Sequence, residues 1–122
     1  MAHKQGDYAA AGALRREGLV IQRELGDRRG IAYSLEGLAE AVVAARGSSR
    51  RAARILGAAE RLREEIGTPL PPIDLPQYEQ RVASARAALG DNAAFDRAWQ
   101  EGRALTLEEA IELALKEPAE RG

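Results

Sequence analysis

The sequence predicts an all-α domain built from antiparallel helical hairpins, and two observations support that fold class. The chain is rich in alanine, leucine, glutamate and arginine, which are strong helix formers, while aromatic residues make up only 4% of it. Apolar residues recur every three or four positions, so each run has one apolar stripe and a charged back. Such stripes must be buried against neighbouring helices, and 122 residues suffice for one domain with one core.

Glycines divide the chain into its expected helices. Gly26, Gly47, Gly67 and Gly90 each follow an apolar periodic run, and the residue after each one is suited to begin a new segment. We therefore expect residues 1–122 to form a single domain. Its helices are expected near residues 7–25, 29–46, 49–66, 75–89, 91–104 and 106–116.

Capping patterns mark two of these helix starts. Thr106 with Glu109, and Asp74 with Gln77, have the spacing of a capping box, in which two side chains bond to each other's backbone N–H groups. The loop between the third and fourth helices, residues 68–74, carries three prolines. Prolines at this density exclude a regular helix and favour a stiff, extended segment.

An internal repeat favours stacked hairpins. Moving the sequence by 41 residues aligns the first helix with the third, and a further shift of 43 aligns the third with the fifth. A small residue then recurs at one place, as Gly18, Ala59 and Gly102, where it would let the neighbouring helix approach closely. A fixed period of this length is typical of helical solenoids.

The second and third helices carry a family resemblance. Large and small residues follow each other at fixed helical spacing: Leu35, Leu38, Ala39, Val42, Ala52, Leu56 and Ala59. This pattern resembles the tetratricopeptide repeat. Residues 52–60, the proline-rich loop and residues 98–110 resemble the C-terminal region of large bacterial regulators of the LuxR-type, ATP-binding class. The resemblance implies a short right-handed superhelical solenoid, with an NTPase core and a DNA-binding or catalytic domain elsewhere in the parent chain.

Composition removes most catalytic classes. The chain has no cysteine, a single histidine, His3, and no phosphate-binding GxxxxGK[ST] loop. Its serines have no histidine partner for nucleophilic catalysis. We therefore expect no enzyme activity, no cofactor and no metal site. No apolar run approaches the roughly 20 residues that span a bilayer, so the expected location is the cytoplasm and no membrane contact is expected.

The function that the resemblance implies is that of a non-catalytic protein-interaction scaffold. In tetratricopeptide arrays, the first helix of each hairpin lines a concave groove that holds an extended peptide or a partner helix. Carried over to this chain, the groove positions are Tyr33, Glu36, Gly37, Glu40, Val43, Glu79, Gln80 and Arg86. The partner would be the upstream domains of the parent chain, another protein or a second copy.

The first helix also presents an apolar edge. Leu14, Ile21 and Leu25 fall on one face of this helix, and the hairpin partner that would cover them precedes the chain. Solenoid ends normally carry polar caps, and this edge has none. We expect it to pair with a second copy in a homodimer.

Two further functions stay open. Arginines recur in the first three helices, at positions 15, 16, 23, 28, 29, 50, 51 and 54, and would bind nucleic acid if they shared one face. The formal net charge of −1 argues against nucleic acid as a partner of this segment. A small-molecule sensor would need a pocket at the proline-rich loop near Trp99, where Phe95 and Tyr78 are otherwise expected to fill the core.

Overall fold

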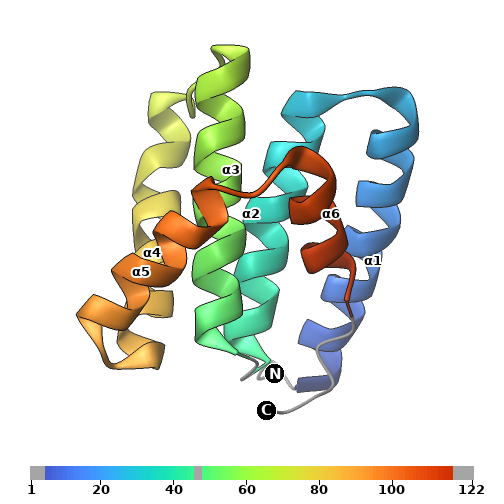
Figure 1. Cartoon of the computed structure of the whole chain (residues 1–122). Helices are drawn as coiled ribbons and strands as arrows, with labels where there is room; N and C mark the ends of the chain where they lie inside the picture. Colours follow the sequence, from blue (N-terminus) through green and yellow to red (C-terminus); the bar gives the residue numbers. More distant parts are fainter. Residues whose placement is uncertain (1–4, 46–47, 117–122) are drawn as a thin grey trace.

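The computed structural model describes residues 5–45 and 48–116, and within these ranges the chain is all-α (Figure 1). Each α-helix begins and ends within two residues of its expected position. A short 3₁₀ turn, η1 (Pro72–Asp74), precedes the fourth helix. The helices are α1 (Gln5–Leu25), α2 (Arg28–Ala44), α3 (Ser49–Ile66), α4 (Leu75–Leu89), α5 (Asn92–Arg103) and α6 (Leu107–Leu115).

Side-chain caps and left-handed glycines explain most of these boundaries. Gly26, Gly67 and Gly90 have φ values of 71°, 66° and 75°, the left-handed conformation that glycine adopts without strain. Gly47 lies outside the described residues. At the start of α6, Thr106 and Glu109 form the expected capping box, with backbone-to-side-chain distances of 2.9 and 3.1 Å.

The second expected capping box does not form. Asp74 has helical dihedral angles and makes no capping hydrogen bond with its side chain. The chain instead enters α4 through η1, where the backbone N–H of Leu75 donates to the carbonyl of Pro72. This tight turn has already placed Asp74 in a helical conformation, whereas a capping side chain needs an extended backbone.

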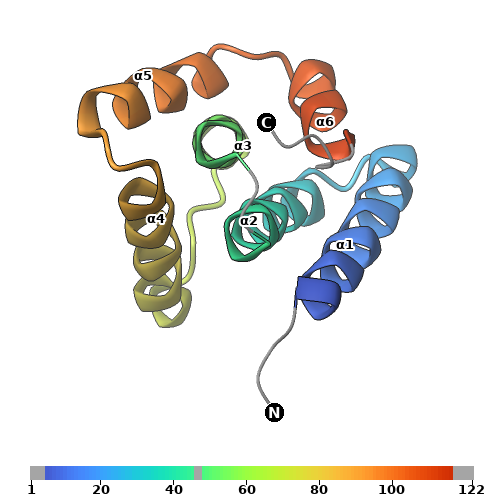
Figure 2. The ribbon, with the colours of Figure 1, turned by 90° about the horizontal axis from the view of Figure 1, so that it is seen from below.

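Helix α3 occupies the centre of the molecule. It packs most extensively against α2 and α5, and it also contacts α4 and α6 (Figure 2). Helix α1 lies antiparallel to α2 on the outside, and α6 turns back to contact α1, α2 and α3. The stacking of hairpins into a right-handed superhelix stays a prediction.

The core consists of aliphatic side chains with a single phenylalanine. Phe95 is fully buried, as expected, and its ring centroid lies 5.8 Å from that of the half-buried Trp99. The other large, fully buried apolar side chains are Leu19, Ile31, Leu35, Leu38, Ile55, Leu56 and Ile111. They come from α1, α2, α3 and α6, so the apolar stripes of these helices meet in one core.

The closest helix packing joins α3 to α5, and it depends on two glycines. A Cβ atom added to Gly57 would collide with the carbonyl oxygen of Trp99, and one added to Gly102 would collide with that of Arg54. The two backbones are therefore in direct contact where α5 crosses α3 (Figure 1). Gly102 thus acts as the repeat predicts. Gly18 does not, because no atom lies within 4 Å of its added Cβ.

Candidate functional site

A groove runs between α2 and α4, and three of the eight residues predicted to line the interaction groove lie in it. Glu40, Val43 and Gln80 line a hollow of about 290 Å³ together with side chains of α4. Glu40 forms an ion pair with Arg81 across the groove, with Nη2–Oε1 at 3.1 Å. The groove is thus bridged by an ion pair between α2 and α4.

The other predicted groove positions lie elsewhere. Glu36 is only 2% exposed, and Gly37 is buried beneath the guanidinium of Arg15. Both are covered because α2 has neighbours on two sides, α1 and α3. Tyr33 and Glu79 are exposed, with Tyr33 lying beneath Arg15. Arg86 turns towards α5, where it lies 4.5 Å from the ring of Phe95.

The Glu36 carboxylate belongs instead to a buried ion pair. Arg63 of α3 donates from Nε and Nη2 to its two carboxylate oxygens, at 2.7 and 3.1 Å. A third hydrogen bond of 3.1 Å runs from Nη1 of Arg63 to the carbonyl of Thr68. The bidentate pair therefore fastens α2, α3 and the proline-rich loop together. In the sequence, this pair could have been suspected from Glu36, a charged residue among the apolar residues of its helix, because charged residues are rarely buried without a partner.

A larger cavity opens beside this ion pair, at the proline-rich loop. It has a volume of about 410 Å³. Its walls come from the end of α3, the loop, the start of α4 and the buried pair. The lining residues are Glu36, Glu60, Arg63, Glu64, Gly67, Pro69, Leu70, Leu75 and Tyr78. The sensor hypothesis required a pocket at this loop, and the structure contains one.

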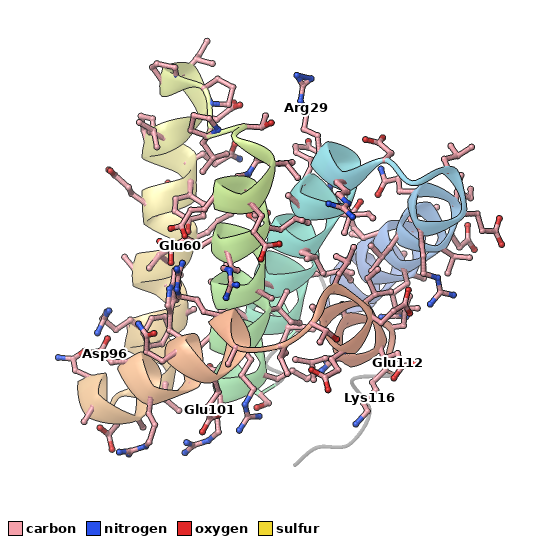
Figure 3. All side chains as sticks on the ribbon, turned by 45° about the horizontal axis from the view of Figure 1, so that its top comes forward. Arg29, Glu60, Asp96, Glu101, Glu112 and Lys116 are labelled. Carbon is pink, nitrogen blue, oxygen red and sulfur yellow. The ribbon has the colours of Figure 1, made fainter. Side chains whose placement is uncertain are left out.

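Glu60 connects the cavity to Trp99. Its Oε1 atom accepts hydrogen bonds from Nε1 of Trp99 at 2.8 Å and from Nη1 of Arg103 at 2.9 Å. Arg103 also bonds both oxygens of Glu64, at 2.8 and 3.1 Å. Figure 3 shows Glu60 directed from α3 towards α4. Trp99 therefore lies next to the cavity wall without lining it.

Two pKa values report the charge around this cavity. Burial raises the pKa of Tyr78 above its ordinary value, and the negative charges of Glu60 and Glu36 raise it further. The hydrogen bond from Arg103 lowers the pKa of Glu64. Tyr78 thus keeps its proton and Glu64 keeps its negative charge at neutral pH, which leaves a hydroxyl group among carboxylates.

The arginines of the first three helices do not share one face. Several are held by partners: Arg15 lies over Tyr33, Arg23 pairs with Glu108, and Arg54 pairs with Glu101. Arg51 donates to two carbonyl groups at the end of α6. The exposed arginines 28 and 29 begin α2, while exposed Arg50 begins α3. Because α2 and α3 are antiparallel, these positions lie at opposite ends of the bundle (Figure 1).

Helices α5 and α6 have the connection length of a helix-turn-helix motif. Three residues, 104–106, join a helix of 12 residues to one of 9. A recognition helix must lie against DNA phosphates, yet α6 exposes the carboxylates of Glu108, Glu109 and Glu112. Phosphate would repel this surface, so α6 is unsuited to read a DNA groove.

The predicted self-association edge is open to solvent. Leu14, Ile21 and Leu25 are 68%, 56% and 74% exposed on the outer side of α1.

In residues 5–45 and 48–116, no helix is long and apolar enough to cross a membrane. The same ranges hold no group of three or more histidine, aspartate or glutamate side chains placed to bind a metal ion.

The chain is similar to part of three mycobacterial proteins that are named provisionally as HTH-type transcriptional regulators. One is from Mycobacterium bovis and two are from strains of Mycobacterium tuberculosis. Each is 41% identical over 75 residues, which is 62% of this chain and only 8% of the relative. No family model matches the chain, and no solved structure matches it.

These relatives correct the expected function. Their names identify transcriptional regulators and not interaction scaffolds, which contradicts the scaffold interpretation and favours the nucleic-acid alternative. They support the regulator context that the resemblance implied, and their names describe regulators and no enzyme activity. The charge balance argued against nucleic acid as a partner, and these names make it a partner that has to be tested. The tetratricopeptide assignment stays a prediction, since no family model supports it.

Proposed function

We propose that this chain is a helical module of a DNA-binding, HTH-type transcriptional regulator of the bacterial cytoplasm. The observation that carries the proposal is the 41% identity over 75 residues with proteins named as such regulators. The match covers only 8% of the length of these relatives. That the whole protein carries a DNA-reading motif is therefore itself part of the proposal. Within the described helices, the surface best suited to touch DNA is the start of α2.

The start of α2 favours phosphate through two neighbouring arginines. Arg28 and Arg29 are adjacent and exposed, and neither forms an ion pair with any residue in the described part of the chain. The first turn of α2 contains no acidic residue, but the N-cap carboxylate of Asp27 accepts a hydrogen bond from the N–H of Gly30 and offsets the partial positive charge of the helix N-terminus. With a net charge of −1, the chain has no long-range attraction for DNA. Binding by this end should therefore be weak and sensitive to salt.

Weak, salt-dependent binding to random duplex DNA is the expected result for the isolated chain. With two phosphate contacts, the logarithm of the binding constant should fall by about 1.8 for each tenfold rise in salt. The double variant Arg28→Gln/Arg29→Gln should remove most of this binding. A gel shift or anisotropy titration at several salt concentrations measures both effects.

Arg50→Gln is the control, because Arg50 is also exposed but lies near the start of α3, at the opposite end of the bundle. It should leave the slope nearly unchanged. If the wild-type chain does not bind at low salt, or if the double variant binds as well as wild type, the start of α2 is not a DNA contact.

The regulator class also supports a homodimer, since helix-turn-helix proteins commonly bind paired half-sites as dimers. We propose that the edge formed by Leu14, Ile21 and Leu25 pairs with the same edge of a second copy. Leu14→Ser/Ile21→Ser should then shift the mass seen by light scattering from dimer to monomer, with the helical circular dichroism unchanged.

Ile73→Ser serves as the control for this experiment, because Ile73 is also a large apolar residue and is 86% exposed, but it lies away from α1. It should leave the mass of the dimer unchanged. A wild-type chain that stays monomeric at high concentration would refute the pairing of α1 edges.

A further inference from the structure

The cavity at the proline-rich loop has the dimensions of a small-molecule site. Its volume of about 410 Å³ falls within the roughly 300–1,000 Å³ that is usual for ligand pockets. Pro69, Leu70 and Leu75 provide an apolar wall, and the charged groups gather on the side formed by α3 and α2. A pocket with apolar walls and a few convergent polar groups is the usual arrangement for binding a small organic molecule.

The charges of the lining select among ligands. Three carboxylates and one guanidinium line the cavity, so the lining is acidic overall. The guanidinium of Arg63 is already bonded to Glu36 and Thr68, which leaves it poorly placed to receive an anion. Arg103, which does not line the cavity, already pairs with Glu60 and Glu64, so the three carboxylates and two guanidiniums leave one excess negative charge. This excess disfavours an anionic ligand, and a purely apolar ligand would strip water from carboxylates without replacing it. A cation avoids both penalties.

Glu60 is the group best placed to receive that cation. Both hydrogen bonds that it accepts reach Oε1, although a carboxylate offers about four acceptor sites on its two oxygens. Its side chain is 40% exposed, so a ligand can reach it from the cavity. Tyr78 lines the same cavity, where burial raises its pKa and the negative charges of Glu60 and Glu36 raise it further.

From these observations, we propose that the cavity binds a small cationic amphipathic molecule, with its ammonium or guanidinium group on Glu60 and its apolar body against Leu70 and Leu75. The site contains neither Arg28 nor Arg29, so this proposal stands or falls independently of DNA binding. Occupancy would be reported by Trp99, the only tryptophan of the chain, because its indole N–H shares Oε1 of Glu60.

Three probes of matched shape and different charge test the proposal: phenethylamine, 2-phenylethanol and phenylacetate. Phenethylamine should change the fluorescence of Trp99 in a saturable way, with a dissociation constant on the order of 1 mM for a ligand of this size. Glu60→Gln should weaken its binding about tenfold, as expected for a charge-assisted hydrogen bond worth roughly 1.4 kcal/mol. The alcohol and the acid should bind much more weakly than the amine.

Because Glu60→Gln also alters the hydrogen bond of Trp99, a second readout that does not depend on this tryptophan is needed. Saturation-transfer NMR of the probes provides it. The control is Glu65→Gln, which removes the same charge from the same helix at a residue that pairs with Arg61 and does not line the cavity. It should leave binding unchanged. Three results would each overturn the proposal: no binding of the amine at roughly 20 mM, about twentyfold above the expected dissociation constant, equal binding of phenylacetate, or equal weakening by Glu65→Gln and Glu60→Gln.

Discussion

Glu36→Leu is expected to destabilise the fold by about 3–5 kcal/mol, because it leaves the buried guanidinium of Arg63 without its counter-charge. The Arg63 side chain is only 10% exposed, and Thr68 alone would remain as its hydrogen-bond partner. A domain of this size is stable by about 5–15 kcal/mol, so a large part of the stability would be lost. Urea unfolding followed by circular dichroism measures the change.

The double variant Glu36→Leu/Arg63→Met distinguishes loss of charge balance from loss of packing. Apolar side chains that replace a buried pair together often leave stability unchanged or increase it. We expect the double variant to recover most of what Glu36→Leu alone loses. If the two single changes instead add up in the double variant, the side chains act by packing and not as a pair.

Gly102→Ala has the second large expected effect. Alanine normally stabilises a helix interior by about 0.5–1 kcal/mol relative to glycine, but here its methyl group would collide with the backbone of Arg54. Helices α3 and α5 would have to separate, and forced overpacking of this kind typically costs about 1–3 kcal/mol. We therefore expect a net loss of stability, measured as a lower urea midpoint.

Gly18→Ala is the matched control, since it makes the same change inside α1 where no atom lies within 4 Å of the new methyl group. It should raise the urea midpoint by the full helix-propensity gain. The opposite signs of the two alanine variants are the test. A stabilising Gly102→Ala would show that α3 and α5 are not held in backbone contact.

The helices were predictable because their signals are local. Glycine conformation at Gly26, Gly67 and Gly90 and the Thr106 capping box depend only on neighbouring residues, and the structure contains each of them. Helix α4 begins at the expected residue, but its capping box was mispredicted because a proline-rich turn replaced the side-chain cap of Asp74. Proline acts on both the residue before it and the turn after it, so the spacing of a capping box is not decisive beside it.

The candidate site was predictable in place but not in composition. Three prolines and a nearby tryptophan indicated where a pocket could form, and the cavity lies at that loop. The partners of its charges could not be predicted, because Arg63 and Glu36 are 27 residues apart and meet only through packing of α2 on α3. The distribution of the arginines could not be predicted for the same reason: Arg29 and Arg50 each lie near the start of a helix, and because α2 and α3 are antiparallel these starts lie at opposite ends of the bundle.

The central position of α3 has a consequence for how the molecule comes apart. In a linear array, a terminal unit can melt while the others persist, because each unit touches only its neighbours. Here α2, α4, α5 and α6 all rest on α3, and α6 also reaches back to α1. Loss of α2, α4, α5 or α6 must therefore disturb the shared helix, so the backbone amides of α3 are expected to exchange with solvent only through cooperative, global opening.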